Sequence, residues 1–231
     1  MTCSLVVNSK SGNTRMVSGA IKRALQAAGV EFIHAAALSD DADADQVARE
    51  AQGACAADTV LVGFWCDKGA CTPSVAALLS ALHGKRVFLF GTCGFGADQS
   101  YYQQIINRVT SNLAEDAELV GWAMCQGKMG PAVKQRYEAM LEQDPDNVRF
   151  KMLLGNWVAA KDHPTKEDLD NMAAAAKKGR AGGVAPIADG GRSIFLNETS
   201  SRASGHEVPC STVLRKTKAT LSGLLCVRNS R

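Results

Sequence analysis

The regular alternation of short apolar runs with amphipathic segments constrains the fold of this chain more than any other feature. Five strand-like runs are each followed by a segment whose apolar residues recur three and four positions apart, as on one face of a helix. Strands that alternate with helices form a parallel sheet with right-handed crossovers. We therefore predict a doubly wound α/β fold, a five-stranded parallel sheet in the order 2-1-3-4-5 with helices on both faces. The expected strands are 4–7, 30–34, 59–64, 86–90 and 118–124.

The segment after the fifth run breaks this alternation. A helix is expected there with Val133 and Tyr137 on its apolar face, followed by a short loop or partial helix through 148–157. The final helix is predicted to begin within 163–168, where the Thr165 side chain can cap the first N–H groups. Gly179 is a natural stop for this helix.

The composition changes after Gly179. From Arg180 onward the chain is rich in Gly, Ser and Arg, and carries eight basic and three acidic residues. The first 179 residues hold the remaining 18 basic and 20 acidic residues, so the net charge of +3 comes from the tail. We interpret 1–179 as one domain and 180–231 as a basic, poorly ordered extension. This balance does not favour a nucleic-acid binder, although the tail leaves open docking to an acidic partner.

The cysteines and the apolar runs indicate the cellular compartment. No run is long enough to span a membrane, and the N-terminus shows no basic and hydrophobic leader, so we expect a cytoplasmic protein with no membrane partner. Its eight cysteines would then be reduced thiols. Cys66 and Cys71 are five residues apart without a second close pair or flanking histidines, so no metal site is predicted.

The turn between the first expected strand and its helix is rich in hydroxyl groups and contains a glycine. Such a turn can hold a phosphate, because hydroxyl donors, unpaired N–H groups and the helix dipole converge there. Ordinary helix capping is the alternative explanation. The candidate residues are Ser9, Lys10, Ser11, Gly12, Asn13 and Thr14.

Two further loops are expected at the same edge of the sheet. In the order 2-1-3-4-5 the first, third and fourth strands are neighbours, and ligands of such sheets bind beyond their C-terminal ends. Each loop offers one aromatic ring, beside glycines that let backbone approach a flat ligand closely. Simple packing of these rings is the alternative. The candidates are Trp65, Cys66, Asp67, Lys68 and Gly69 in one loop, and Thr92, Cys93, Gly94, Phe95 and Gly96 in the other.

With these loops in view, residues 1–178 resemble a flavodoxin-type FMN domain. The phosphate-loop pattern of that family is met by Ser9, Gly12 and Thr14, whereas Val7 and Ser18 replace a usual aromatic residue and a usual alanine. Other landmarks resemble a flavodoxin-domain subgroup that includes the accessory flavodoxin of bilirubin reduction; they are 63–69, 89–94, 125–129 and His163-Pro164.

The resemblance implies an FMN-binding electron-transfer protein, accessory to a reductase, with a redox partner protein. An NAD(P)H-dependent flavin or quinone reductase and a flavin-free binding module on the same fold remain alternatives. The sequence shows no arrangement of catalytic residues, so an electron carrier is favoured over a stand-alone enzyme. Cys93 is a candidate redox-active thiol, with a plain polar loop residue as the alternative. The partners, the reduction potentials and the oligomeric state stay open.

Overall fold

The computed structural model describes residues 2–96 and 98–180. Its strands form one parallel sheet in the order β2-β1-β3-β4-β5, which confirms the predicted fold class. The prediction of a poorly ordered extension at 180–231 lies outside the described residues, apart from Arg180, and stays a prediction. The strands are β1 (Thr2–Asn8), β2 (Glu31–Leu38), β3 (Thr59–Trp65), β4 (Arg86–Cys93) and β5 (Glu118–Gln126).

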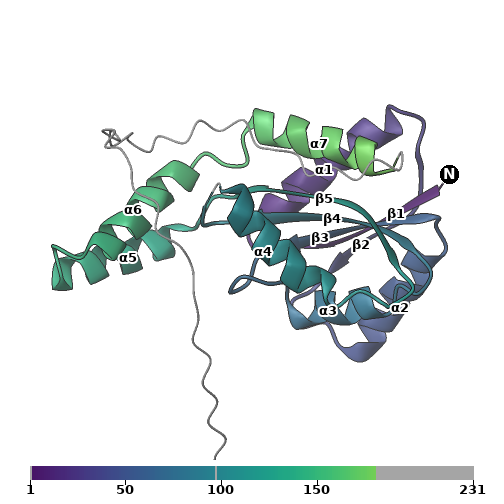
Figure 1. The fold of residues 1–231 in the computed structure, drawn as a ribbon, viewed down its shortest axis with the longest axis horizontal. Coiled ribbons are helices and arrows are strands. Elements are labelled where there is room, and N and C mark those ends of the chain that lie inside the picture. Colours follow the sequence, from purple (N-terminus) through teal and green to yellow (C-terminus); the bar gives the residue numbers. More distant parts are fainter. Residues whose placement is uncertain (1, 97, 181–231) are drawn as a thin grey trace, which may run out of the picture. The chain divides into compact units, whose positions relative to one another are not determined.

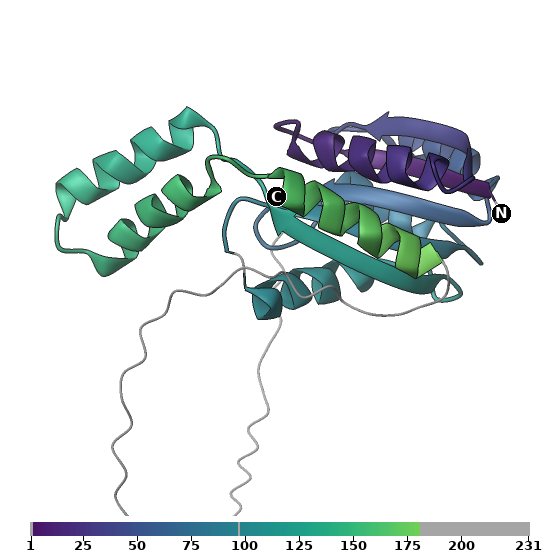
Figure 2. The same ribbon diagram turned by 90° about the horizontal axis from the view of Figure 1, so that it is seen from above.

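Two helix layers cover the sheet (Figures 1 and 2). On one face, α1 and α7 bury Ile21 and Met172 in a hydrophobic cluster with Leu61 and Phe90 of the sheet. On the other face, α2, α3 and α4 pack in a second cluster around residues such as Phe64. The bounds of these helices are α1 (Asn13–Gln26), α2 (Ala44–Cys55), α3 (Pro73–Ser80), α4 (Gln99–Thr110) and α7 (Lys166–Arg180).

The strand β2 extends four residues beyond its predicted end. Its residues alternate between exposed and half-buried up to Leu38, as expected for a strand at the edge of a sheet. The segment 35–37 consists of three alanines, which give little contrast between an inner and an outer face. The strand pattern is therefore weak in the sequence just where β2 continues.

Between β5 and α7 the chain forms a pair of helices, α5 (Pro131–Gln143) and α6 (Val148–Ala160). Figure 1 shows the two helices packed against each other beside the sheet rather than on either face. We expected a short loop or a partial helix through 148–157, and the structure has a helix over this segment that continues to Ala160. Asn147 caps α6 by accepting hydrogen bonds from the N–H groups of Arg149 and Phe150. In α6 only Ala160 is buried, although Phe150, Leu153, Leu154 and Trp157 recur at helical spacing in its sequence.

The two ends of the segment that contains α5 and α6 meet beside the sheet. The N–H of Lys128 donates to the carbonyl of His163 at 2.8 Å, just before α7 begins. The Thr165 hydroxyl accepts from the N–H of Asp168 at 3.1 Å, and the Asp168 carboxylate accepts from the N–H of Thr165 at 2.6 Å. This reciprocal capping box confirms the predicted role of Thr165. None of the described helices is long and apolar enough to cross a membrane.

Candidate functional site

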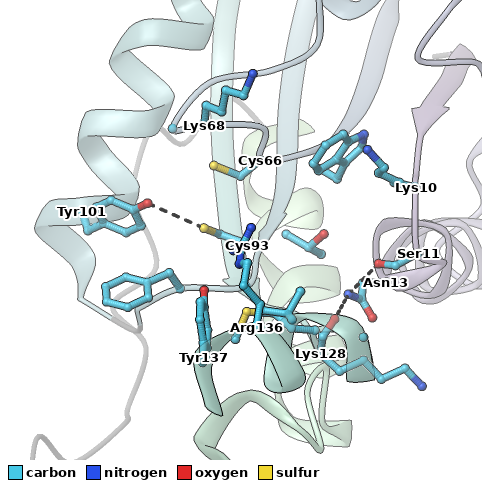
Figure 3. Close-up of a pocket in the computed structure, with 18 of the residues that line it drawn as sticks. Lys10, Ser11, Asn13, Cys66, Lys68, Cys93, Tyr101, Lys128, Arg136 and Tyr137 are labelled. Atoms are coloured by element: carbon cyan, nitrogen blue, oxygen red, sulfur yellow. Dashed lines mark hydrogen bonds between the residues drawn. The ribbon is translucent and has the colours of Figure 1, made fainter. Parts of the chain in front are cut away.

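A cavity of about 620 Å³ lies at the C-terminal ends of β1, β3 and β4 (Figure 3). The three predicted loops supply one wall of it, so the topology brings them together as expected. Five predicted residues, Ser9, Gly12, Thr14, Asp67 and Gly96, do not line the cavity. The predicted residues that do line it are Lys10, Ser11, Asn13, Trp65, Cys66, Lys68, Gly69, Thr92, Cys93, Gly94 and Phe95.

The first loop leaves the N-terminus of α1 open. Gly12 occupies the N-cap position in the left-handed region, with φ +89°, and no side chain caps the helix from there. A Cβ at Gly12 would meet nothing within 4 Å, so there is free space over this turn. The Ser9 hydroxyl accepts a hydrogen bond from the N–H of Arg15 at 3.2 Å. Thr14 is buried and shares a hydrogen bond of 2.9 Å with Thr92, so its hydroxyl joins the first turn of α1 to the end of β4.

Asn13 connects this loop to the opposite wall of the cavity. Its Nδ2 donates to the Ser11 hydroxyl at 3.1 Å and to the Lys128 carbonyl at 2.9 Å (Figure 3). Its Oδ1 is buried and has no hydrogen-bond partner within the part of the chain that the structure describes. A buried acceptor of this kind is costly unless a partner satisfies it, so it is available to a ligand donor.

The second loop is a tight turn with φ of 49° at Lys68 and 84° at Gly69. Two backbone hydrogen bonds between Asp67 and Ala70 close it, which is the pattern of a type I′ turn. The glycine suits this turn because a side chain is strained at positive φ. Asp67 thus holds the turn through its backbone, and Lys68 and Gly69 reach the cavity.

Trp65 is held by a residue that the sequence did not indicate. Its Nε1 donates to Asp40 Oδ1 at 2.8 Å, and Asn8 Nδ2 donates to the same oxygen at 2.8 Å. The Lys10 ammonium lies 4.6 Å from the centre of the indole ring, a cation–π contact. Lys10 therefore covers one face of the ring that we expected to meet a flat ligand.

The third loop is fixed by α6, for which the sequence predicted a short loop or a partial helix. Asn156 Oδ1 accepts from the N–H of Gly96 at 3.1 Å, and its Nδ2 donates to the Gly94 carbonyl at 3.0 Å. The Phe95 ring packs edge-on against Tyr101, with centroids 6.3 Å apart. The two glycines of this loop thus use their backbone polar groups for attachment to the helix pair.

The opposite wall of the cavity was not predicted. It comes from α4, from the loop after β5 and from α5. The sequence predicted helices in two of these segments but did not indicate that any of the three lies at the edge of the sheet. Of these segments, the sequence singled out only the Gly- and Pro-containing loop at 127–131. The lining residues that were missed are Tyr101, Arg108, Lys128, Met129, Gly130, Val133, Arg136 and Tyr137.

The cavity is basic. Lys10, Lys68, Arg108, Lys128 and Arg136 line it and all are exposed, while no described Asp, Glu or His does so. Positive charge of this kind raises the local concentration of anions and favours their binding. No group of three or more potential metal-ligating residues occurs in 2–96 or 98–180.

Two thiols lie in the same cavity. Cys93 is 5% exposed, and the hydrogen bond from the Cys66 thiol lowers the pKa of Cys93 to about 7. The same hydrogen bond and burial raise the pKa of Cys66. Burial also raises the pKa of Cys71 to about 11 and that of the Tyr101 phenol to about 12. Cys93 is therefore the thiol that ionises first among those with a perturbed pKa.

Comparison with known proteins settles the family. The flavodoxin domain model matches residues 4–177. This chain belongs to the flavodoxin domain family. The "Flavodoxin-like domain-containing protein BilS" of Clostridium symbiosum (strain WAL-14163) is 35% identical over 182 residues, covering 73% of this chain and 90% of the relative. The protein of the same name from Clostridioides difficile (strain CD3) is 35% identical over 112 residues, which are 48% and 64% of the two chains.

Among solved structures, oxidised flavodoxin 2 from Bacillus cereus is 16% identical, with coverage of 78% of this chain and 98% of that chain and a TM-score of 0.43. A TM-score this low adds nothing about function. The family match and the BilS relatives confirm the resemblance found in the sequence, down to its subgroup. Membership of this family indicates flavin binding and electron transfer.

Proposed function

We propose that this protein binds FMN in the basic cavity and carries electrons for a partner reductase in the cytoplasm. The observation that supports this most is the pairing of a helix N-terminus whose N-cap glycine has no side chain with hydroxyl and ammonium donors at one end of a cavity. The rest of the cavity is lined by aromatic rings and by loop backbone. An anionic ligand with a flat ring, bound at the strand ends of an open parallel sheet, fits this donor set.

The phosphate of FMN would be held by the first loop. The α1 dipole and its open N–H groups favour negative charge there, and Ser11 and Lys10 add a hydroxyl donor and a cation. The open space over Gly12 lets a phosphate approach the helix end. Ser9 supports the loop through its bond to the Arg15 N–H.

The ring system would lie between the second and third loops. Residues of these two loops line this part of the cavity, and Trp65 and Phe95 offer apolar faces. Bound FMN would supply one- and two-electron transfer, and the protein sets its potential through these contacts. In this arrangement Lys10 would exchange its contact with the indole ring for the phosphate.

The exposed cations around the cavity indicate what the partner surface is like. Charge complementarity steers association and selects the orientation of docking. An acidic patch around the electron-accepting group of the partner would match Lys68, Arg108 and Arg136. We therefore propose a reductase with an acidic docking face as the redox partner.

Direct oxidation of NAD(P)H is the second candidate function. One observation favours it. Three of the cations that line the cavity, Lys68, Arg108 and Arg136, lie outside the loop that would hold the phosphate of FMN. They leave positive charge for a second anionic ligand beside the flavin.

An anaerobic electron-transfer assay tests the proposal and separates the two candidates. The full chain is loaded with FMN, desalted, reduced with dithionite and mixed with cytochrome c as a one-electron acceptor. We expect flavin-dependent reduction of the acceptor, and no flavin reduction when NADH or NADPH replaces dithionite. Rapid reduction by NAD(P)H would establish the second candidate, and a folded protein that retains no FMN would overturn both.

A further inference from the structure

Cys66 and Cys93 stand opposite each other on neighbouring strands. Trp65 pairs with Thr92 in the register of β3 and β4, and each cysteine is the next residue of its strand or loop. The N–H of Cys66 donates to the Thr92 carbonyl at 2.9 Å, so the ladder continues to this position. Neighbouring strands are about 4.8 Å apart, which lies within the range of roughly 4.4–6.8 Å between Cα atoms that a disulfide spans.

Both side chains reach the same space. Residues in register on parallel strands point to the same side of the sheet, and both cysteines line the cavity. Figure 3 shows both thiols next to each other, with Cys93 directed toward the hydroxyl of Tyr101 at 4.0 Å. The interaction between the two thiols is the largest cause of the pKa shift of each, and both are free cysteines in the structure. Two sulfur atoms so placed need little backbone movement to bond.

The two thiols differ in a way that assigns them different steps. The hydrogen bond from Cys66 stabilises the thiolate of Cys93 and holds its pKa below the usual range, whereas the pKa of Cys66 is raised. A thiolate is the nucleophile in thiol–disulfide exchange. The lowered pKa of Cys93 favours it as the attacking group, which leaves Cys66 as the resolving group.

We propose that Cys66 and Cys93 form a reversible dithiol–disulfide centre in the wall of the cavity, which exchanges electrons with low-molecular-weight disulfides. The Cys93 thiolate attacks one sulfur of a small disulfide, forming a mixed disulfide and releasing one thiolate. The sulfur of Cys66 then loses its proton and attacks Cys93, and the second thiolate leaves. The pair loses two electrons and two protons in total, and the small disulfide becomes two thiols.

This assignment does not depend on flavin binding, so it can be tested on the flavin-free chain. The full protein is equilibrated anaerobically in mixtures of 2-hydroxyethyl disulfide and 2-mercaptoethanol, quenched with acid, alkylated and digested with trypsin. We expect the peptide 50–68 linked to the peptide 87–108, with fragment ions that place the bond between Cys66 and Cys93. Its yield should rise to more than half of the chain at oxidising ratios and return to zero at reducing ones.

Cys71→Ser is the matched control, because Cys71 is also half-buried in the same loop but does not line the cavity. This variant should give the same titration as the wild type, and Cys66→Ser and Cys93→Ser should give no linked peptide. The wild-type result alone decides the matter, whatever the variants do to folding. Complete alkylation of both thiols at the most oxidising ratio, or a bond to Cys71 or Cys55 instead, would overturn the proposal.

Discussion

The two walls of the cavity are built in opposite ways. The sheet wall consists of loops that leave strands whose side chains are almost all buried, such as Phe64 and Phe90, each 0% exposed. The helix wall includes Arg136 and Tyr137 of α5, whose partner α6 exposes Val148 and Met152 at 78% and 55%. The first wall is thus fixed by the core of the domain. The second depends on a few hydrogen bonds, chiefly those of Asn13 and Asn156.

Because of this difference, we expect the sheet wall to determine folding stability and the helix wall to determine binding specificity. Buried apolar area dominates the free energy of folding, so the sheet wall should tolerate little change. A peripheral helix pair with few buried side chains belongs to the low-stability end of a structure. The helix wall should therefore influence ligand and partner binding more than folding.

Phe64→Ala compared with Met152→Ala gives the largest expected contrast. Removing the Phe64 ring leaves a cavity under the sheet wall and should lower the free energy of unfolding by about 3–5 kcal/mol. Met152 is 55% exposed, and its truncation should change the same quantity by less than about 0.5 kcal/mol. Urea denaturation followed by circular dichroism measures both. Similar losses for the two variants would show that the helix pair is as much a part of the core as the sheet.

Asn13→Ala tests the link between the walls. It removes the hydrogen bonds to Ser11 and to the Lys128 carbonyl, and should weaken FMN binding by about 10- to 100-fold, or roughly 1.5–3 kcal/mol. Gly127→Ala should act similarly, since its Cβ would lie 2.6 Å from Asn13 Nδ2. Asn112→Ala is the control, because this amide also makes two hydrogen bonds but does not line the cavity. Unchanged FMN affinity in both test variants would mean that the walls act independently.

Thr165→Ala tests the cap of α7, the helix that follows the pair α5 and α6 and packs on the sheet. Loss of this N-cap should lower the free energy of unfolding by about 1 kcal/mol, since α7 packs on α1 and β5. Thr110→Ala, at the end of α4, removes a hydroxyl that bonds only locally and should cost less. An equal or smaller loss for Thr165→Ala, again in urea, would contradict the cap assignment.

Arg136→Ala compared with Lys134→Ala should give the smallest effect. Both cations are on α5, but only Arg136 lines the cavity, while Lys134 pairs with Glu138 at 2.7 Å. Because Arg136 is exposed, its removal should weaken FMN binding by about two- to five-fold at low salt. The difference should vanish near 0.5 M salt, where exposed charges are screened over a few ångströms. FMN titrations at two salt concentrations check this, and equal effects of the two variants would remove Arg136 from the site.

The comparison also shows how far the sequence could predict the molecule. The strands, the three loops and the Thr165 cap follow from local patterns, because strand and helix periodicity and capping chemistry act within a few residues. The helix wall depends on contacts between distant segments, such as Asn13 with Lys128 and Asn156 with Gly94. No local pattern specifies these contacts. Asp40 was missed for the same reason, since its role follows only from the place of Trp65 in the fold.

The FMN site itself is tested most directly by titrating FMN into the purified full chain and following flavin fluorescence and absorption. The account predicts saturable quenching at one FMN per chain, shifted flavin bands, and at least about ten-fold weaker binding in Lys10→Ala/Ser11→Ala, which removes a cation and a hydroxyl donor. Arg15→Ala, a neighbouring exposed cation that does not line the cavity, should bind as the wild type does. Unchanged flavin fluorescence in the presence of the folded wild-type protein would contradict the account.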